Sequence, residues 1–202
     1  MSAREEMLGR IRTALGASPA VREVPRSYRQ AGEGSGDPVD LFCERVSDYQ
    51  AAVHRTTAAE LGPALAAACE ARGSRRLMAA PGVDWEVVGM ELTVDGPDVP
   101  IAELDAVDGA LTGCALAIAE TGTFVLDGSP LCGRRALTLV PDHHVCVVRA
   151  EQIVAGVPDA VSELDGARPI TLVSGPSATS DIELERVEGV HGPRQLDVVV
   201  VA

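Results

Sequence analysis

Residues 172–201 read Leu172-Val-Ser-Gly-Pro-Ser-Ala-Thr-Ser-Asp-Ile-Glu-Leu-Glu-Arg-Val-Glu-Gly-Val-His-Gly-Pro-Arg-Gln-Leu-Asp-Val-Val-Val-Val201, and they carry the sharpest fold signal in the chain. Two apolar runs, Ile170–Val173 and Val198–Val201, frame this stretch. Both are rich in β-branched residues and barely alternate with polar ones. That pattern is typical of strands buried on both faces of a parallel sheet.

Two polar loops lie between these runs, Ser174-Gly175-Pro176-Ser177 and Gly189-Val190-His191-Gly192-Pro193, with a short helix expected around Ser180–Val187. A Gly/Ser loop between a parallel strand and a helix aims backbone N–H groups at one point, which suits an anion. Open α/β folds bind ligands at the carboxyl ends of their strands. The alternative is that Gly175 and Pro176 only form a turn and that Ser177 or Ser180 caps a helix. The second loop, with its histidine, leaves the two interpretations evenly balanced.

The rest of the chain alternates expected helices and strands. Helices are predicted at Ala3–Leu15, Asp37 to about Arg55, Ala58–Arg72, Ala150–Val157 and Asp159–Leu164. Strands are predicted at Arg76–Ala80, around Val99–Ile101, and at Ala115–Ala119, Thr123–Leu126, Ala136–Val140 and Val145–Val148. This order predicts an α/β, three-layer, Rossmann-like domain with a mostly parallel sheet covered on both faces.

The domain is expected to span residues 37–202, preceded by a helix and linker over residues 1–36. Residues 17–36 are rich in Pro, Gly, Ser and charge, which is typical of a linker. The N-terminal helix is therefore expected to be tethered. It could pack on a second subunit and make a homo-oligomer, on another partner, or on its own domain.

Composition narrows the classes of function. The formal net charge of −13 argues against a nucleic-acid surface and against docking on an anionic membrane. All 17 basic residues are arginine, so Schiff-base chemistry and a P-loop lysine are excluded. No run reaches the roughly 18 apolar residues of a membrane span, and the N-terminus shows no secretion signal. We therefore expect a cytoplasmic protein.

The five cysteines are scattered and form no Cys-x-x-Cys pair. Such spacing argues against a local zinc or iron–sulfur site, so we expect no metal and no cofactor on this chain. In a reducing compartment these cysteines are expected to act as small core residues.

A second informative stretch is Ala115-Leu-Ala-Ile-Ala-Glu-Thr-Gly-Thr-Phe-Val-Leu-Asp127. Glu120 ends an apolar run and precedes Thr121-Gly122-Thr123. Burial would raise the pKa of Glu120 and make it a candidate general acid or base. Gly122 is expected to supply a turn or bulge, and the threonines offer hydroxyl groups. The alternative is a hairpin turn in which Glu120 faces water, and the residues alone weigh the two equally.

Other polar residues are weaker candidates. Arg134 and Arg135 could clamp a carboxylate or phosphate, but pairing with the abundant surface acids is at least as plausible. His143 and His144 are adjacent on a predicted strand and so point to opposite faces, and His144 is the better candidate for a ligand edge. His191 lies in the glycine-bracketed loop and could donate a hydrogen bond or act in acid–base chemistry. Asp181 and Glu183 follow the Gly-Pro-Ser loop, where they could simply complement a helix dipole.

Four segments in order resemble the LUD domain, and more narrowly the lactate-utilization protein C family. They are Ala117–Thr123 (Ala-Ile-Ala-Glu-Thr-Gly-Thr), Val140–Val145 (Val-Pro-Asp-His-His-Val), Ser174–Glu183 (Ser-Gly-Pro-Ser-Ala-Thr-Ser-Asp-Ile-Glu) and Gly189–Pro193 (Gly-Val-His-Gly-Pro). The resemblance covers about Asp37 to Ala202, and the N-terminal helix is also similar. The chain departs from the pattern at Ala178, where many relatives carry Arg, so an anion contact at that position is in doubt. It also lacks the cysteine motifs of the longer, iron–sulfur LUD proteins.

The resemblance implies a fold similar to the isomerase and CoA-transferase-like superfamily. It also implies a part in oxidising L-lactate to pyruvate alongside iron–sulfur partner proteins, with this chain binding a small anionic metabolite or supporting the complex. By analogy with the superfamily, Glu120 would be the catalytic carboxylate, assisted by His191. The ligand would be held by Thr121, Gly122, Thr123, His144, Ser174, Gly175, Pro176, Ser177, Asp181, Glu183 and Gly192. The alternative function is a stand-alone enzyme on an acyl or sugar-phosphate metabolite, with Glu120 as acid, base or nucleophile. A third is a ligand sensor that has lost its chemistry.

Overall fold

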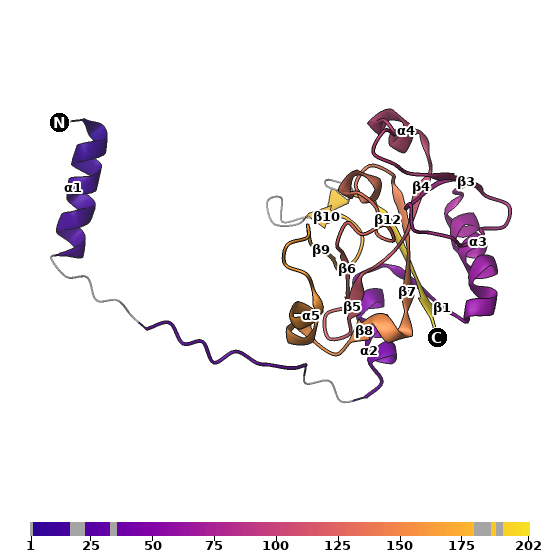
Figure 1. Ribbon diagram of the computed structural model, residues 1–202, viewed down its shortest axis with the longest axis horizontal. Helices are drawn as coiled ribbons and strands as arrows, with labels where there is room; N and C mark the ends of the chain where they lie inside the picture. Colours follow the sequence, from indigo (N-terminus) through magenta and orange to yellow (C-terminus); the bar gives the residue numbers. More distant parts are fainter. Residues whose placement is uncertain (1, 17–22, 33–35, 180–186, 189–191) are drawn as a thin grey trace.

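The computed structural model describes residues 2–16, 23–32, 36–179, 187–188 and 192–202. Its centre is a six-stranded sheet in the order β1-β12-β7-β4-β2-β3, and every pair of neighbours is parallel. The strands are β1 (Ala52–Thr56), β2 (Arg76–Ala79), β3 (Glu91–Val94), β4 (Gly109–Gly113), β7 (His143–Arg149) and β12 (Gln195–Val201). The mostly parallel, Rossmann-like three-layer α/β fold predicted from the sequence is confirmed (Figure 1).

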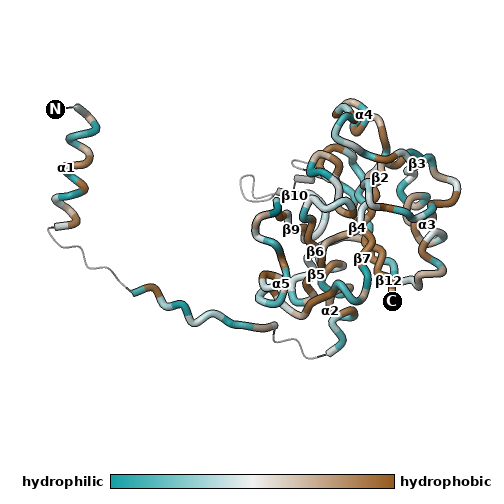
Figure 2. The backbone as a smooth tube through the Cα atoms, viewed as in Figure 1, coloured by the Kyte–Doolittle hydropathy of each residue, from teal (hydrophilic) through white to brown (hydrophobic). Residues whose placement is uncertain are grey.

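The two faces of the central sheet are covered by different elements. On one face, helix α3 (Leu61–Arg72) packs Leu65 against Val199 and Val201 of β12. On the other face, helix α2 (Pro38–Asp48) and a second sheet cover Val198 and Val200. Because successive side chains of a strand alternate between faces, both faces of β12 need apolar residues. This explains the predicted run Val198–Val201, which Figure 2 shows as the hydrophobic end of the chain.

The second sheet has four strands in the order β8-β5-β6-β9. Its members are β5 (Leu116–Ile118), β6 (Thr123–Leu126), β8 (Ile153–Val154) and β9 (Thr171–Val173). Strands β5 and β6 form an antiparallel hairpin, β9 runs antiparallel to β6, and β8 runs parallel to β5. Helix α5 (Val157–Glu163) packs its Ala160 on the outer face of this sheet, beside Leu116 and Val125.

The expectation of a buried parallel strand at Ile170–Val173 was wrong in two respects. Strand β9 is antiparallel and lies at an edge of the second sheet. Its Val173 packs on the core, but Leu172 is 61% exposed. An edge strand is covered on only one face, so its alternate side chain remains in solvent.

Three expected elements have a different structure. The helix predicted to run to about Arg55 ends at Asp48, and the chain then enters β1. Gln50, which lies between them, has a φ of 66°, a left-handed conformation that stops a helix. Residues 135–138 form a short 3₁₀ helix, η2, and not a strand over Ala136–Val140. Residues 150–154 form the 3₁₀ helix η3 and then β8, where a helix was predicted.

Two further differences occur between β2 and β5. The strand expected near Val99–Ile101 does not form there. The strand of this region is β3, which lies earlier in the chain, and helix α4 (Ile101–Ala106) begins at Ile101. Strand β4 was not predicted. It is fully buried at the middle of the sheet, and small residues such as Gly109 and Gly113 are required there: a Cβ on Gly113 would lie 2.6 Å from Leu131 Cγ.

The helices predicted at Ala3–Leu15, Ala58–Arg72 and Asp159–Leu164 agree with the structure. The short helix expected around Ser180–Val187 falls mostly outside the described residues, and Val187 belongs to a strand: β10 (Ala178–Thr179) and β11 (Val187–Glu188) form a small antiparallel sheet. The 3₁₀ helix η1 (Ala58–Glu60) leads into α3, which ends at Gly73 in the left-handed conformation, as the glycine indicated. The capping pattern at Thr57 makes no side-chain hydrogen bond. Four of the five cysteines are buried and Cys43 is intermediate, and all five are free thiols. Burial raises the pKa of Cys69 and of Cys132 to about 11.

Helix α1 (Ala3–Leu15) stands apart from the α/β body at the end of an extended segment (Figure 1). Ser2 and Glu5 form a capping box at its start, and none of its residues is buried. Described residues of this segment contact the body, for example through Arg29 and Gly32. Arg29 pairs with Glu120, and the N–H of Gly32 donates to Asp159 Oδ2 at 2.8 Å. Across the described ranges, no helix is both long and apolar enough to cross a bilayer.

Candidate functional site

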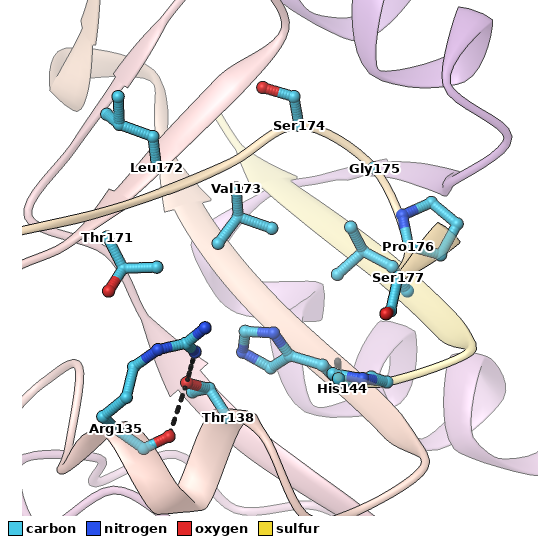
Figure 3. A pocket seen from close by; sticks show the side chains of 13 residues that line it. Arg135, Thr138, His144, Thr171, Leu172, Val173, Ser174, Gly175, Pro176 and Ser177 are labelled. Carbon is cyan, nitrogen blue, oxygen red and sulfur yellow. Dashed lines mark hydrogen bonds between the residues drawn. The ribbon is translucent and has the colours of Figure 1, made fainter. Parts of the chain in front are cut away.

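A cavity of about 220 Å³ lies between the two sheets, beside the amino ends of β7 and β12. Its lining comprises Arg135, Thr138, His144, Thr171, Leu172, Val173, Ser174, Gly175, Pro176, Ser177, Gly192, Pro193 and Leu196 (Figure 3). The sequence had pointed to the carboxyl edge of the parallel sheet, but this cavity is at the opposite edge. Only the second sheet matches that expectation, because Ser174 directly follows the carboxyl end of β9.

Arg135 supplies the positive charge of the cavity. Its Nη1 donates to Thr138 Oγ1 at 2.9 Å, within the same 3₁₀ helix. Among the described residues, no carboxylate lies within ion-pair distance of its guanidinium. Arg134 differs, because it binds the buried Asp95 through Nε and Nη2, each at 2.9 Å from a carboxylate oxygen. Partial desolvation lowers the pKa of Arg135 from its ordinary value, and an anion in the cavity would offset that cost.

His144 forms the buried wall of the cavity, next to Arg135 (Figure 3). It is 2% exposed, and its Nε2 lies 2.8 Å from Thr112 Oγ1. Its ring packs edge-on against Phe124, with the ring centroids 5.7 Å apart. Burial, with smaller contributions from His143 and Arg135, lowers the pKa of His144 to about 3. The imidazole is therefore neutral at neutral pH and can bind a ligand only through hydrogen bonds.

The loop Ser174–Ser177 closes one side of the cavity. Gly175 has a φ of 89°, and a Cβ there would lie 2.7 Å from Tyr49 Cβ, so only glycine fits against the end of α2. The N–H of Ser177 donates to the carbonyl of Pro193 at 2.8 Å. This hydrogen bond joins the first polar loop to the second, and residues of both loops line the cavity. That N–H group is thus already bonded within the protein.

The Glu120 turn lies outside this cavity. Glu120 follows β5 in the hairpin, its side chain is 36% exposed, and its carboxylate receives Arg29 Nη2 at 2.7 and 2.8 Å. Gly122 has a φ of 56°, and a Cβ there would lie 2.6 Å from the backbone carbon of Arg45 in α2. Glu120 thus lies in a hairpin turn, partly buried and paired with Arg29.

A chain of hydroxyl groups connects this turn to the cavity. Thr121 Oγ1 lies 2.7 Å from Thr123 Oγ1, which in turn lies 2.7 Å from Ser174 Oγ. Ser174 lines the cavity, whereas the two threonines lie behind it. The structure therefore brings together His144, Ser174–Ser177 and Gly192 and leaves Glu120 apart. His191, Asp181 and Glu183 lie outside the described residues.

A buried polar network lies behind the cavity, and sequence reasoning missed it. Asp197 is 1% exposed and accepts hydrogen bonds from His54 Nε2 at 2.6 Å, Arg72 Nε at 2.9 Å and His143 Nε2 at 3.1 Å. Burial raises the pKa of Asp197, but the three donors outweigh it and the net pKa is about 2. The only sequence signal was an acid at the start of a valine run.

Ser74 extends this network, since its Oγ lies 2.9 Å from His143 Nδ1. Ser74, His143 and Asp197 are therefore linked as in a Ser-His-Asp triad. Ser74 is only 3% exposed, however, and lines neither of the cavities at this edge of the sheet, so a substrate has no route to its hydroxyl. This network holds together β1, β2, β7, β12 and the end of α3. Within the part of the chain that the structure describes, no group of three or more His, Cys, Asp and Glu residues is placed to hold a metal ion.

Comparisons with known proteins agree with this architecture. The family model "LUD domain" matches residues 100–201. A lactate utilization protein C from Deinococcus radiodurans is 45% identical over 98% of this chain and 95% of its own length. Another from Bacillus velezensis is 28% identical over 97% of this chain and 91% of its own length. The crystal structure of a DUF162 family protein from Deinococcus radiodurans superposes with a TM-score of 0.70 at 43% identity, covering 82% of this chain and 96% of that one. The chain therefore belongs to the LUD-domain family, in the group of lactate utilization protein C.

Proposed function

We propose that this chain serves lactate utilization by binding a small carboxylate in the cavity at the amino ends of β7 and β12. The observation that carries the proposal is Arg135, a cation with no carboxylate partner among the described residues, placed beside a neutral His144. The chain has 30 acidic residues, so an arginine in a cavity that pairs with no carboxylate of the described residues is a specific feature. The lactate utilization proteins to which the chain is similar supply the expected ligand class.

The lining suits a 2-hydroxy acid. Arginine binds a carboxylate through paired N–H donors, and Arg135 would take this role. His144 uses Nε2 toward Thr112, which leaves Nδ1 for the ligand. A ligand hydroxyl can both donate and accept, so it matches Nδ1 in either tautomer. The volume of about 220 Å³ lies below the range of drug-sized pockets and fits a three-carbon acid.

Oxidation of lactate to pyruvate removes two electrons and two protons from the acid. We assign the electron transfer to iron–sulfur partner proteins, in keeping with the family resemblance. The role of this chain is then to bind the acid or to support the complex. The extended segment before the domain, with its exposed helix α1, offers a contact for such a partner or for a second copy of the chain.

Isothermal titration calorimetry of the full chain with L-lactate and with pyruvate tests the proposal. The wild type should bind at least one of the two acids, and Arg135→Leu should weaken that binding about tenfold or more, since it removes a charge-assisted hydrogen bond. The matched control is Arg55→Leu, because Arg55 pairs with Asp40 on the exposed surface. If the wild type binds neither acid, or if Arg135→Leu binds as well as the control, the cavity is not a carboxylate site.

The hydroxyl chain from Thr121 to Ser174 favours a second candidate, an enzyme that uses Glu120. It links the Glu120 turn to the cavity through side chains 2.7 Å apart. Glu120→Gln separates the candidates because it keeps the shape of the side chain and removes its basicity. Lactate-dependent growth should survive this substitution if the chain acts by binding, and should be lost if Glu120 performs the chemistry.

A further inference from the structure

Strand β3 closes one edge of the central sheet, and only one of its two faces is covered. Its Leu92 packs on the core at the α3 side. On the other face Glu91 and Thr93 are exposed, and Thr93 Oγ1 lies 3.3 Å from the sulfur of Met78 on β2. Helix α4 packs Leu104 in the same core cluster as Met78, but it has only six residues and leaves this strip of the sheet open. Parallel sheets normally carry helices over both faces, so the strip is a place where a covering helix is missing.

A hollow of about 180 Å³ lies at this strip, away from the first cavity, which lies between the two sheets. Met78 and Val107 give the hollow an apolar floor, and the exposed Glu91 and Glu103 stand on its rim. Among the described residues, neither of these two carboxylates has an ion-pair partner. Arg76 also lines the hollow, but its guanidinium donates to a carbonyl at the end of α4 and is held there. The hollow is smaller than most ligand pockets and suits an apolar side chain from another element.

Helix α1 has an apolar face that nothing covers. Met7, Leu8, Ile11 and Leu15 lie at helical spacing and form one stripe, with side chains between 37% and 64% exposed. A helix of 13 residues is only marginally stable in water without packing against another element. The same chain therefore holds a sheet face that lacks a helix and a helix that lacks a partner.

The charges of the two surfaces are opposite in sign. Arg4 precedes Leu8 by four residues and Arg12 follows it by four, so both arginines lie along the apolar stripe. Neither arginine has an ion-pair partner among the described residues. Residues 1–32 carry six arginines and three glutamates, whereas residues 77–133, which include β3 and α4, contain no basic residue. The basic stripe thus complements the carboxylates on the rim of the hollow.

The length of the N-terminal segment indicates which copy of α1 fills the hollow. The contacts of Arg29 with Glu120 and of Gly32 with Asp159 hold this segment beside α5. Figure 1 shows α5 and α4 at opposite ends of the body. The connection from Leu15 to Arg29 is about fourteen residues long and spans at most roughly 50 Å. A domain of this size has a radius of roughly 20 Å, so the path over its surface between opposite ends is roughly 60 Å. The α1 helix of the same chain falls short of the hollow, which leaves that of a second copy.

We propose that two copies of this chain exchange their α1 helices, each placing the apolar stripe of its helix in the hollow beside α4 of the other. An apolar side chain of the stripe enters the hollow over Met78. Arg4 and Arg12 then face the carboxylates of Glu91 and Glu103. Because the exchange is reciprocal, the assembly closes as a two-fold dimer. It requires no ligand and does not depend on the function proposed for the first cavity.

Sedimentation velocity of the full chain tests the exchange. We expect the wild type to be a dimer and Ile11→Glu, which places a charge in the middle of the stripe, to be a monomer at the same concentration. The body should fold normally in this variant, because no residue of α1 is buried. The matched control is Glu6→Arg/Arg10→Glu, which reverses an ion pair away from the stripe and should leave the dimer unchanged. A monomeric wild type, or a dimer that survives Ile11→Glu, would overturn the proposal.

A charge exchange locates the surface that α1 contacts. Arg4→Glu/Arg12→Glu reverses the stripe, and it should raise the dissociation constant of the dimer about tenfold or more, because like charges then meet. Glu91→Arg/Glu103→Arg reverses the rim and should have the same effect. All four substitutions in one chain should restore dimerisation, since the reversed stripe again meets a rim of opposite charge. If the fourfold variant dimerises as weakly as its two parents, α1 contacts a different surface and exchange into this hollow is refuted.

Discussion

Acidification from pH 7 to about pH 5 is expected to destabilise this protein through His144. Burial holds the pKa of His144 at about 3 in the folded chain, whereas an unfolded histidine titrates near 6.5. Between these values the unfolded chain binds a proton that the folded chain rejects. The free energy of unfolding therefore falls as the pH drops below about 6.5, and it continues to fall until about pH 3.

The expected loss follows from the two pKa values. Each unit of pH between them costs about 1.4 kcal/mol, so the descent from pH 7 to about pH 5 removes roughly 2 kcal/mol. Asp197 does not contribute in this window. Its folded pKa of about 2 lies below the ordinary 3.8, so its stabilisation is complete above about pH 4 and is lost as the pH falls toward 2.

Guanidinium unfolding at pH 7, 6 and 5 measures the effect, and His144→Gln is the control. Glutamine keeps a hydrogen-bonding group near Thr112 but does not titrate. The other three histidines are the same in both proteins, so the difference between the two pH dependences isolates His144. We expect the wild type to lose about 2 kcal/mol more than His144→Gln over this range. Identical pH dependence would refute the conclusion that the fold keeps His144 neutral.

Three further predictions concern stability at neutral pH, each measured by guanidinium unfolding. Gly122→Ala should cost roughly 2–4 kcal/mol, because alanine disfavours a φ of 56° and its Cβ would lie 2.6 Å from the Arg45 backbone; a loss below about 1 kcal/mol would contradict this packing. Gln50→Gly should stabilise by about 1 kcal/mol, since glycine adopts the left-handed conformation without strain, and destabilisation would show that the Gln50 side chain matters more than its backbone. Asp197→Asn should cost about 3 kcal/mol or more, because Arg72 and the two histidines would lose a buried anionic acceptor; a neutral result would mean that the network is not charged.

Several elements of the fold could be predicted from local patterns alone. Helix α1 shows its apolar residues at helical spacing, and α3 ends at Gly73 where a left-handed cap was expected. The strand β6 and the turn at Gly122 also follow from their own residues. In each case the determining interactions span only a few residues.

Other elements depend on their neighbours in space. Strand β4 has no apolar run, and it is a strand because β2 and β7 pair with it on both sides. The apolar segment at Ala136–Val140 was predicted as a strand, yet it forms a 3₁₀ helix that packs Leu137 against Leu104. Strand β9 looks like a buried strand in isolation, but its place at a sheet edge exposes Leu172.

The candidate site shows the same division. The sequence pointed to the Ser174–Ser177 loop and to His144, and both line the first cavity. It left Arg135 undecided between a clamp and a surface pair, because the position of every acidic residue in space was unknown. It also joined Glu120 to the site by analogy, whereas in the structure Glu120 pairs with Arg29 from the N-terminal segment.

The sequence by itself determined the class of the fold and the family of the protein. Apolar periodicity, glycine caps and ordered motifs are local properties, and they can be read without coordinates. Only the tertiary structure decided which polar groups meet. Asp197 lies beside His54 and His143 because β1, β12 and β7 are distant in the chain but neighbours in the sheet, and the end of α3 brings Arg72 to the same carboxylate. The 3₁₀ helix η2 places Arg135 in the cavity that His144 lines. The burial that keeps His144 neutral and Asp197 charged arises from those same contacts, since desolvation and hydrogen bonding depend on the assembled core.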